Sequence, residues 1–109
     1  MRFREVWLFL VCSLLFVQLN AFASAENPRE RGAALFTASG CRHCHTIQSV
    51  GGHKGPDLSG VGRRLTNTQI RMQILQGGNQ MPPFVNDLES EEVNDLVAYL
   101  RSCRAKTKK

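Results

Sequence analysis

The chain has 109 residues, a formal net charge of +5 and four cysteines. That length allows one small domain and excludes a two-domain enzyme. Most of the aromatic residues lie within the first 25 positions, and the rest of the chain has only Phe36, Phe84 and Tyr99, so we expect a lean core that needs a metal, disulfides or a cofactor.

Residues 1–25 have the three-part layout of a secretory signal peptide. Arg2 and Arg4 form a short basic start, and an apolar run follows over residues 6–19. The small residues at 23–25 match a cleavage site, so we predict removal of this segment after Ala25.

Removal after Ala25 leaves a mature domain of residues 26–109, which we expect to work in the periplasm. A retained membrane anchor is the alternative, although the apolar stretch is short for a membrane span and is interrupted by Gln18 and Asn20. Export permits disulfides. The three cysteines that remain, however, are an odd number and cannot form a closed set of bridges.

The first helix of the mature chain is predicted to begin at Asn27. Asparagine suits the N-cap, Pro28 suits the first helical position, and Glu30 completes the pattern of a capping box. We expect this helix to run to about Ser39, with Gly40 at its end.

Two of the remaining cysteines lie in the motif Cys41-Arg42-His43-Cys44-His45. The pattern C-x-x-C-H is the attachment signal for c-type haem. The two thiols add to the two vinyl groups on one edge of the porphyrin, and the histidine that follows supplies the proximal nitrogen to the iron. The motif therefore predicts one covalently bound haem c, held by Cys41 and Cys44 and ligated by His45.

Two other interpretations of the cysteine pair remain open at this point. It forms half of a zinc site if Cys103, His43 or His53 completes the ligand set, but the chain has no second C-x-x-C. A thioredoxin-like redox pair is the other alternative, and it requires a βαβ setting that no strand pattern here supports. His43 is interpreted as a solvated loop residue.

The segment from Gly51 to Gly62 is predicted to be a loop without regular structure, because five glycines and one proline fall within it. A second helix is predicted to begin at the capping box formed by Thr66 and Gln69 and to end at Gly77.

A proline-stiffened strap follows the second helix, and its Met81 is the predicted sixth ligand of the iron. Met81 precedes Pro82 and Pro83, which cannot enter a helix interior, so the segment is irregular and stiff. Met72 lies within the second helix and is interpreted as core packing. His53 as the ligand, or an open sixth site, are the alternatives.

The last helix is predicted to begin near Ser90. Its apolar positions follow the spacing i, i+3, i+4, i+7 of a helix that packs on one face: Val93, Leu96, Val97 and Leu100. Together with the other helical patterns, this spacing predicts an all-α chain with one long glycine-rich loop.

Several short motifs are distributed over the mature chain: Gly32-x-x-x-Phe36, Cys41-x-x-Cys44-His45, Gly55-Pro56-x-Leu58, Met81-Pro82 and Tyr99-Leu100. With these motifs the mature sequence resembles a class I cytochrome c of the short bacterial type. The resemblance implies a small cytochrome c fold, in which three to four helices wrap around one covalently bound haem.

The resemblance also implies roles for individual residues. The N-terminal and C-terminal helices would cross closely, as Gly32 permits. The carbonyl of Pro56 would accept a hydrogen bond from the second ring nitrogen of His45, which orients the ring. Leu58 and Leu65 would lie against the haem face.

Histidine and methionine ligands together saturate the iron and leave no place for a substrate. The predicted function is therefore electron transfer, as a periplasmic mono-haem protein that shuttles single electrons between redox partners and is not an enzyme. The alternatives are a dedicated haem subunit of a periplasmic dehydrogenase or oxidase, and a haem peroxidase or gas sensor with a labile sixth site.

Basic side chains lie around the predicted loop and form a C-terminal tail at about residues 104–109: Lys54, Arg63, Arg64, Arg71, Arg104, Lys106, Lys108 and Lys109. A solvated surface is the plain interpretation. The functional interpretation is steering toward redox proteins with acidic docking faces. Arg63 or Arg64 is a candidate partner for a haem propionate. We expect no nucleic-acid partner, and membrane association only through partner complexes or an uncleaved anchor.

Cys103 falls at the edge of the apolar stripe of the last helix. We predict that it packs partly against the core and has no chemical function. The competing interpretation is an intermolecular disulfide.

Overall fold

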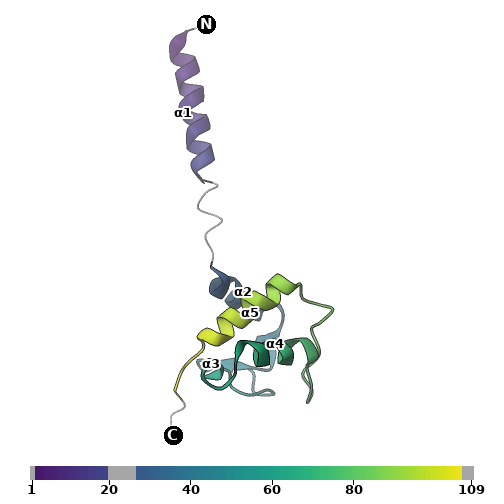
Figure 1. Ribbon diagram of the computed structural model, residues 1–109. Helices are drawn as coiled ribbons and strands as arrows, with labels where there is room; N and C mark the ends of the chain where they lie inside the picture. Colours follow the sequence, from purple (N-terminus) through teal and green to yellow (C-terminus); the bar gives the residue numbers. More distant parts are fainter. Residues whose placement is uncertain (1, 20–26, 107–109) are drawn as a thin grey trace.

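The computed structural model describes residues 2–19 and 27–106. The elements in chain order are α1 (Phe3–Leu19), α2 (Pro28–Ala38), a 3-10 turn η1 (Cys41–His43), β1 (Thr46–Ile47), β2 (Val50–Gly51), α3 (Val61–Arg64), α4 (Asn67–Gln76) and α5 (Ser90–Ser102). Figure 1 shows α1 apart from the other helices, which gather around α5. The described fold is rich in helices, so the prediction of an all-α chain is confirmed.

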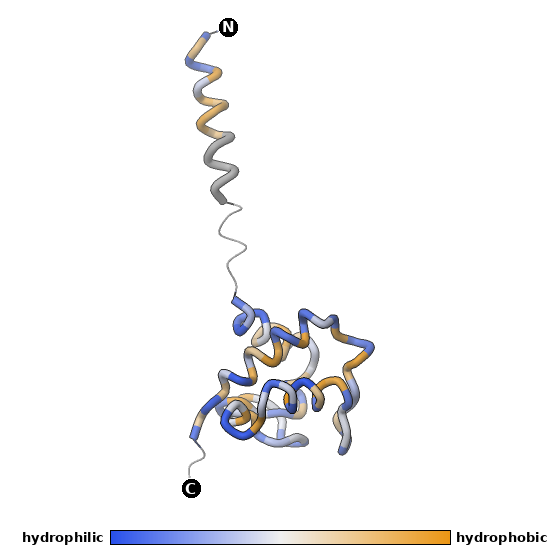
Figure 2. Tube along the Cα trace, viewed as in Figure 1, coloured by the Kyte–Doolittle hydropathy of each residue, from blue (hydrophilic) through white to orange (hydrophobic). Residues whose placement is uncertain are grey.

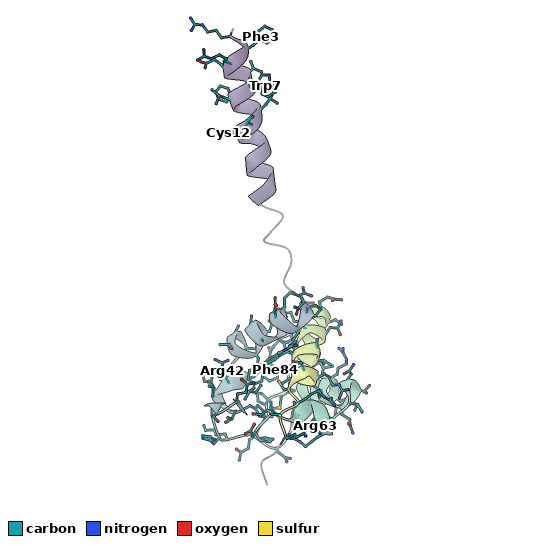
Figure 3. All side chains as sticks on the ribbon, turned by 90° about the vertical axis from the view of Figure 1, so that its left-hand side faces the viewer. Phe3, Trp7, Cys12, Arg42, Arg63 and Phe84 are labelled. Atoms are coloured by element: carbon teal, nitrogen blue, oxygen red, sulfur yellow. The ribbon has the colours of Figure 1, made fainter. Side chains whose placement is uncertain are left out.

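Helix α1 covers the apolar run of the predicted signal peptide. Its described large side chains are exposed, among them Phe3 and Trp7, which Figure 3 shows projecting from the helix. The orange segments of this helix in Figure 2 mark its apolar positions. None of the helices in residues 2–19 and 27–106 meets the length and hydropathy needed to cross a membrane. The predicted cleavage site after Ala25 lies outside the described residues, so the boundary of the mature chain stays a prediction.

Helices α2 and α5 cross at Gly32, as the family resemblance implies. A Cβ atom at this position would lie 2.0 Å from the carbonyl oxygen of Asp95, so only glycine lets the two backbones approach this closely. Beside the crossing, Arg31 donates two hydrogen bonds to the buried carboxylate of Asp95, at 2.9 and 3.1 Å. This two-point contact fixes the angle between α2 and α5.

The core lies between α5 and the other short helices. Its buried hydrophobic residues are Phe36, Val61, Ile70, Ile74, Val93, Leu96, Val97 and Leu100. All four predicted stripe positions of α5 belong to this set. Phe36 of α2 meets Tyr99 of α5 edge-on, with ring centroids 5.7 Å apart, an arrangement that aromatic pairs favour.

The predicted helix starts are confirmed. The side chain of Asn27 caps α2 by accepting a hydrogen bond from the backbone of Glu30. Thr66 and Gln69 form both bonds of the capping box that opens α4. Helix α5 begins at Ser90 as predicted, with Glu89 as its N-cap, and the carboxylate of Glu92 accepts a hydrogen bond from the backbone N–H of Glu89 at 2.9 Å.

The prediction that residues 51–62 lack regular structure is wrong at both ends. Gly51 pairs with Thr46 in the small antiparallel hairpin of β1 and β2. Val61 and Gly62 begin the one-turn helix α3 and are both buried. The buried Val61 side chain supplies the packing that overrides the weak helical preference of its glycine neighbours.

Candidate functional site

The two motif cysteines and the motif histidine lie on a single helical turn. Residues 41–43 form η1, and the backbone N–H groups of Cys44 and His45 both donate to the carbonyl of Cys41, at 3.3 and 3.0 Å. Side chains at i, i+3 and i+4 of a helical turn share one side. The turn therefore presents Cys41, Cys44 and His45 together, and all three are half-buried.

The ring of His45 is oriented by the backbone of Pro56. His45 Nδ1 lies 2.8 Å from the carbonyl oxygen of Pro56. Since a carbonyl only accepts hydrogen bonds, Nδ1 carries a proton, and in the neutral ring Nε2 then keeps its lone pair. A neutral imidazole with a free Nε2 lone pair is the form that ligates a metal. The donor set at this position therefore fits a haem iron.

A glycine-rich clasp holds the motif turn from the outside. The backbone N–H groups of Gly52 and Gly55 donate to the carbonyls of Arg42 and Cys44, at 2.9 and 2.7 Å. A Cβ atom at Gly55 would lie 2.6 Å from the ring of His45. The clasp thus needs glycine because its backbone lies directly against the ring and the motif turn.

The leucines predicted to contact the haem face and the arginines predicted to bind a propionate lie in or beside α3. Leu58 and Leu65 flank this helix and are both half-buried against the core. Arg63 and Arg64 form its last turn and are exposed, and Arg63 is labelled in Figure 3. The guanidinium of Arg64 donates to the carbonyl of Asp57 at 3.2 Å.

Met81 lies on a tight strap directly after α4. Gly78 and Met81 exchange two backbone hydrogen bonds, each of 2.9 Å, which close a four-residue turn. The side chain of Met81 is half-buried. Gln73 of α4 lies beside it, with Nε2 3.8 Å from Met81 Sδ. Gln73 is not among the predicted site residues, because nothing in the sequence alone shows that its side chain reaches Met81.

The two alternative ligands have different surroundings from Met81. His53 is exposed, and its Nδ1 lies 3.5 Å from the hydroxyl of Thr46. Met72 is 48% exposed, so its interpretation as buried core packing is wrong. Its helix α4 directs Ile70 and Ile74 into the core, which leaves Met72 on the outer face.

Cys103 lies at the C-terminal end of α5 and packs partly against the core. Its thiol donates to the carbonyl of Tyr99 at 3.5 Å. Burial raises the pKa of the Cys103 thiol and that of Cys41. The predicted partial packing of Cys103 is confirmed.

The start of the predicted basic tail is bound to the fold. Arg104 donates to the carbonyl of Gly62 at 2.6 Å, and the backbone of Ala105 donates to Ser59 at 2.9 Å. Arg71, from the predicted basic cluster, donates to the side chain of Asn94. Residues 107–109 lie outside the described part of the chain.

Comparisons with known proteins agree with these features. The family described as cytochrome c oxidase, cbb3-type, subunit III matches residues 27–100. A cytochrome c-553-like protein of Synechocystis is 38% identical over 67% of this chain and 67% of its own length. Cytochrome c-555 of Methylococcus capsulatus is 28% identical over 72% of this chain and 65% of its own length.

Two further similarities involve larger proteins or assemblies. Cytochrome c oxidase subunit 2 of Alkalihalophilus pseudofirmus is 30% identical over 75% of this chain, but the match spans only 29% of that subunit. The crystal structure of SoxXA from P. pantotrophus superposes with a TM-score of 0.65 at 23% identity, covering 75% of this chain and 85% of the other. At that identity the likeness concerns the fold alone.

Proposed function

Because the chain belongs to the family of cytochrome c domains described as cbb3-type cytochrome c oxidase subunit III, we propose that it transfers single electrons between redox partners outside the cytoplasm. As a c-type cytochrome it carries a covalently bound haem c and acts in electron transfer with redox proteins. The proposed attachment residues are Cys41 and Cys44, and the proposed axial ligands are His45 and Met81. When bound, the haem supplies a one-electron iron couple.

The observation that supports this proposal most is the hydrogen bond between His45 and Pro56. Their 2.8 Å contact holds the Nδ1 proton and leaves Nε2 free for the iron. An acceptor on Nδ1 also raises the basicity of the ring and prevents its rotation. His45 is thus preorganised as a ligand, and preorganisation keeps the rearrangement on electron transfer small.

Met81 is the proposed sixth ligand because its backbone is already fixed by the turn with Gly78. A thioether in the sixth position favours the reduced iron and raises the potential. With both axial positions filled by protein, no site remains for a substrate, and this supports an electron carrier over a peroxidase or gas sensor. Leu58 and Leu65 are the proposed apolar contacts of the haem face, and Arg63 is a proposed propionate partner together with Arg64.

The proposed export depends on the signal-peptide pattern of residues 1–25 and on the class of the relatives. Thiols join haem to proteins of this kind after export, and an exported chain must keep Cys41 and Cys44 reduced until then. Mass spectrometry of the periplasmic protein tests this point. The expected mature chain begins at Glu26, and a retained N-terminus would establish the anchor instead.

A dedicated oxidase subunit is a second candidate, favoured by the family description and by the match to an oxidase subunit 2. Size-exclusion chromatography of native extracts at high salt distinguishes a free electron carrier from a dedicated oxidase subunit. A free carrier elutes alone at the size of a small domain, because steering by its basic side chains is weakened by salt. A fixed subunit elutes with a large complex.

The ligand assignment is tested by Met81→Ala in the haem-loaded protein. Oxidised wild type is expected to show the near-infrared sulfur-to-iron charge-transfer band, and Met81→Ala is expected to lose it. The variant should have a lower reduction potential and bind carbon monoxide in its ferrous form, since the sixth position opens.

Met72→Ala is the matched control, because Met72 is a half-exposed methionine of neighbouring α4. It should retain the band and the potential. If Met81→Ala instead keeps the wild-type potential and does not bind carbon monoxide, the assignment of Met81 is wrong and His53 becomes the candidate ligand.

A further inference from the structure

The side chain of Gln73 joins the last turn of α4 to the strap that contains Met81. Its Nε2 atom donates to the carbonyl of Gly77 at 3.0 Å and lies 3.8 Å from Met81 Sδ. A carbonyl oxygen and a thioether sulfur are both acceptors, so the amide must present its nitrogen to them. The NH₂ group of Gln73 has two hydrogens, so it can donate one to each acceptor.

The backbone of the strap has little freedom next to this contact. A Cβ atom at Gly77 would lie 2.4 Å from the Met81 carbonyl oxygen and 2.7 Å from the backbone of Pro82, so helix end and strap touch directly. The reciprocal bonds between Gly78 and Met81 fix the strap on its other side. These backbone contacts do not fix the side chain of Met81. The side chain of Gln73 does contact it, by donating to its sulfur.

We propose that Gln73 is a positioning residue for Met81, which holds the thioether in place by donating an amide hydrogen to its sulfur. This inference rests on the proposed role of Met81 as axial ligand. A thioether sulfur has two lone pairs, so it can bind a metal through one and accept a weak hydrogen bond through the other. Gln73 and the iron therefore do not compete.

The contact affects both the potential and the strength of ligation. The positive end of the amide dipole near the sulfur disfavours the more positive ferric state. It also reduces the motion of the thioether, so a competing ligand displaces Met81 less easily. Loss of the contact should therefore lower the reduction potential and raise the affinity of the ferric protein for an added ligand.

The test compares Gln73→Leu with Gln76→Leu in the haem-loaded protein. Gln76 is the last residue of α4, is exposed, and lines the same shallow hollow as Gln73. For Gln73→Leu the equilibrium constant for reduction is expected to fall about three- to tenfold, the range that corresponds to one hydrogen bond. The affinity of the ferric protein for imidazole is expected to rise by a similar factor. Both quantities should stay within about twofold for Gln76→Leu.

Thermal unfolding distinguishes a role of Gln73 in capping the end of α4 from its proposed role in positioning Met81. If Gln73→Leu melts at a lower temperature but keeps the wild-type potential and imidazole affinity, Gln73 only caps the helix and the proposal is overturned. If Gln73→Leu does not fold, Gln73→Glu replaces it, since an exposed carboxylate keeps the shape without a donor. The imidazole affinity of ferric Gln73→Glu is then compared with that of wild type, and equal affinities overturn the proposal.

Failure of the underlying function has a different signature. If the unmodified protein lacks the sulfur-to-iron charge-transfer band, Met81 is not the ligand and the proposed ligand set, on which this inference rests, is wrong. If the band is present and Gln73→Leu changes neither potential nor imidazole affinity, only the inference about Gln73 fails.

Discussion

Position 32 lies where α2 and α5 cross, and only a hydrogen atom fits there. An added Cβ would be 2.0 Å from the Asp95 carbonyl oxygen and 2.7 Å from Tyr99 Cβ. We expect Gly32→Ala to lower the free energy of unfolding by about 3 kcal/mol, because the helices must separate to admit a methyl group. Urea denaturation of the haem-loaded protein, followed by circular dichroism, measures this.

Ala34→Ser is the control for Gly32→Ala, since Ala34 lies on the exposed side of the same helix. It should cost about 0.5 kcal/mol, the difference in helix propensity. Equal stabilities of the two variants would mean that α2 and α5 do not cross as closely as described.

Asp57 contributes stability that depends on pH. Hydrogen bonds from Ser59, first from its hydroxyl and then from its backbone N–H at 2.8 Å, lower the pKa of this carboxyl, and the charge of Arg64 acts in the same direction. The folded state therefore binds fewer protons than the unfolded state in acid. The contribution of Asp57 to folding stability is complete above the ordinary carboxyl pKa, and it is lost as the pH falls through the lowered pKa of the folded state.

Asp57→Asn tests this dependence. Its unfolding free energy should fall less steeply than that of wild type as the pH decreases below about 4, where an unperturbed aspartate titrates. Urea titrations at a series of pH values give the two slopes. Parallel curves for the two proteins would show that the Ser59 contacts do not perturb Asp57.

Single residues of the site are predictable from the sequence where a chemical requirement fixes their spacing. The motif Cys41-x-x-Cys44-His45 is recognisable because two thiols and one imidazole must reach one ring system. Pro56 came from the family resemblance, and its contact with His45 agrees with that role. Gln73 was not predictable, because its role depends on a side chain that contacts a later segment of the chain.

Two tight turns adopt a left-handed backbone without glycine. The central residues are Gln48 and Ser49 in the β1–β2 hairpin, and Asn79 and Gln80 in the Met81 strap, all with positive φ. Positive φ at both central positions characterises the type I′ turn, in which Asn-Gly is preferred. Residues 48 and 49 lack that signature, and this explains why the hairpin was missed.

Gln80→Gly is expected to stabilise the protein by about 0.5 kcal/mol, since glycine removes the left-handed penalty but gains freedom in the unfolded chain. Gln80 has a φ of 78° and an exposed side chain, so the substitution removes strain without removing packing. A strap without this strain should keep its turn more firmly and so also lower the affinity of the ferric protein for imidazole. Urea denaturation and imidazole titration measure the two effects.

Ser49→Gly makes the same change in the other turn, where φ is 67°. It should raise the free energy of unfolding by a similar amount and leave the imidazole affinity unchanged, because the hairpin does not contain Met81. A loss of stability in Gln80→Gly would show that the strap is not strained at this residue.

Helices were predictable where capping and periodicity agree. The capping pairs at Asn27 and Thr66 begin helices in the structure as expected. The outward position of Met72 was missed because a single methionine in a helix does not indicate which face is buried. Helix α3 was missed because four residues are too few to show a period.

At the scale of the whole molecule, the protein interior made by helices alone is small. Eight hydrophobic side chains are buried, and Phe36 is the one aromatic residue among them in the described part of the chain. Sequence composition predicted this lean core and the need for a metal, disulfides or a cofactor. The position of the Met81 strap was not predictable, because it depends on how α4 and α5 pack.

Removal of the haem should therefore affect the stability of the entire domain. We expect Cys41→Ala with Cys44→Ala to abolish stable haem attachment, and the free energy of unfolding to fall by several kcal/mol, because a domain of about 80 residues gains little from its own core. Haem in the unmodified protein should resist extraction with acidified acetone.

Cys103→Ser is the control, since Cys103 is half-buried at the end of α5, and it should keep the haem with a loss of about 1 kcal/mol or less. Acid-resistant haem in the double variant would contradict attachment at Cys41 and Cys44.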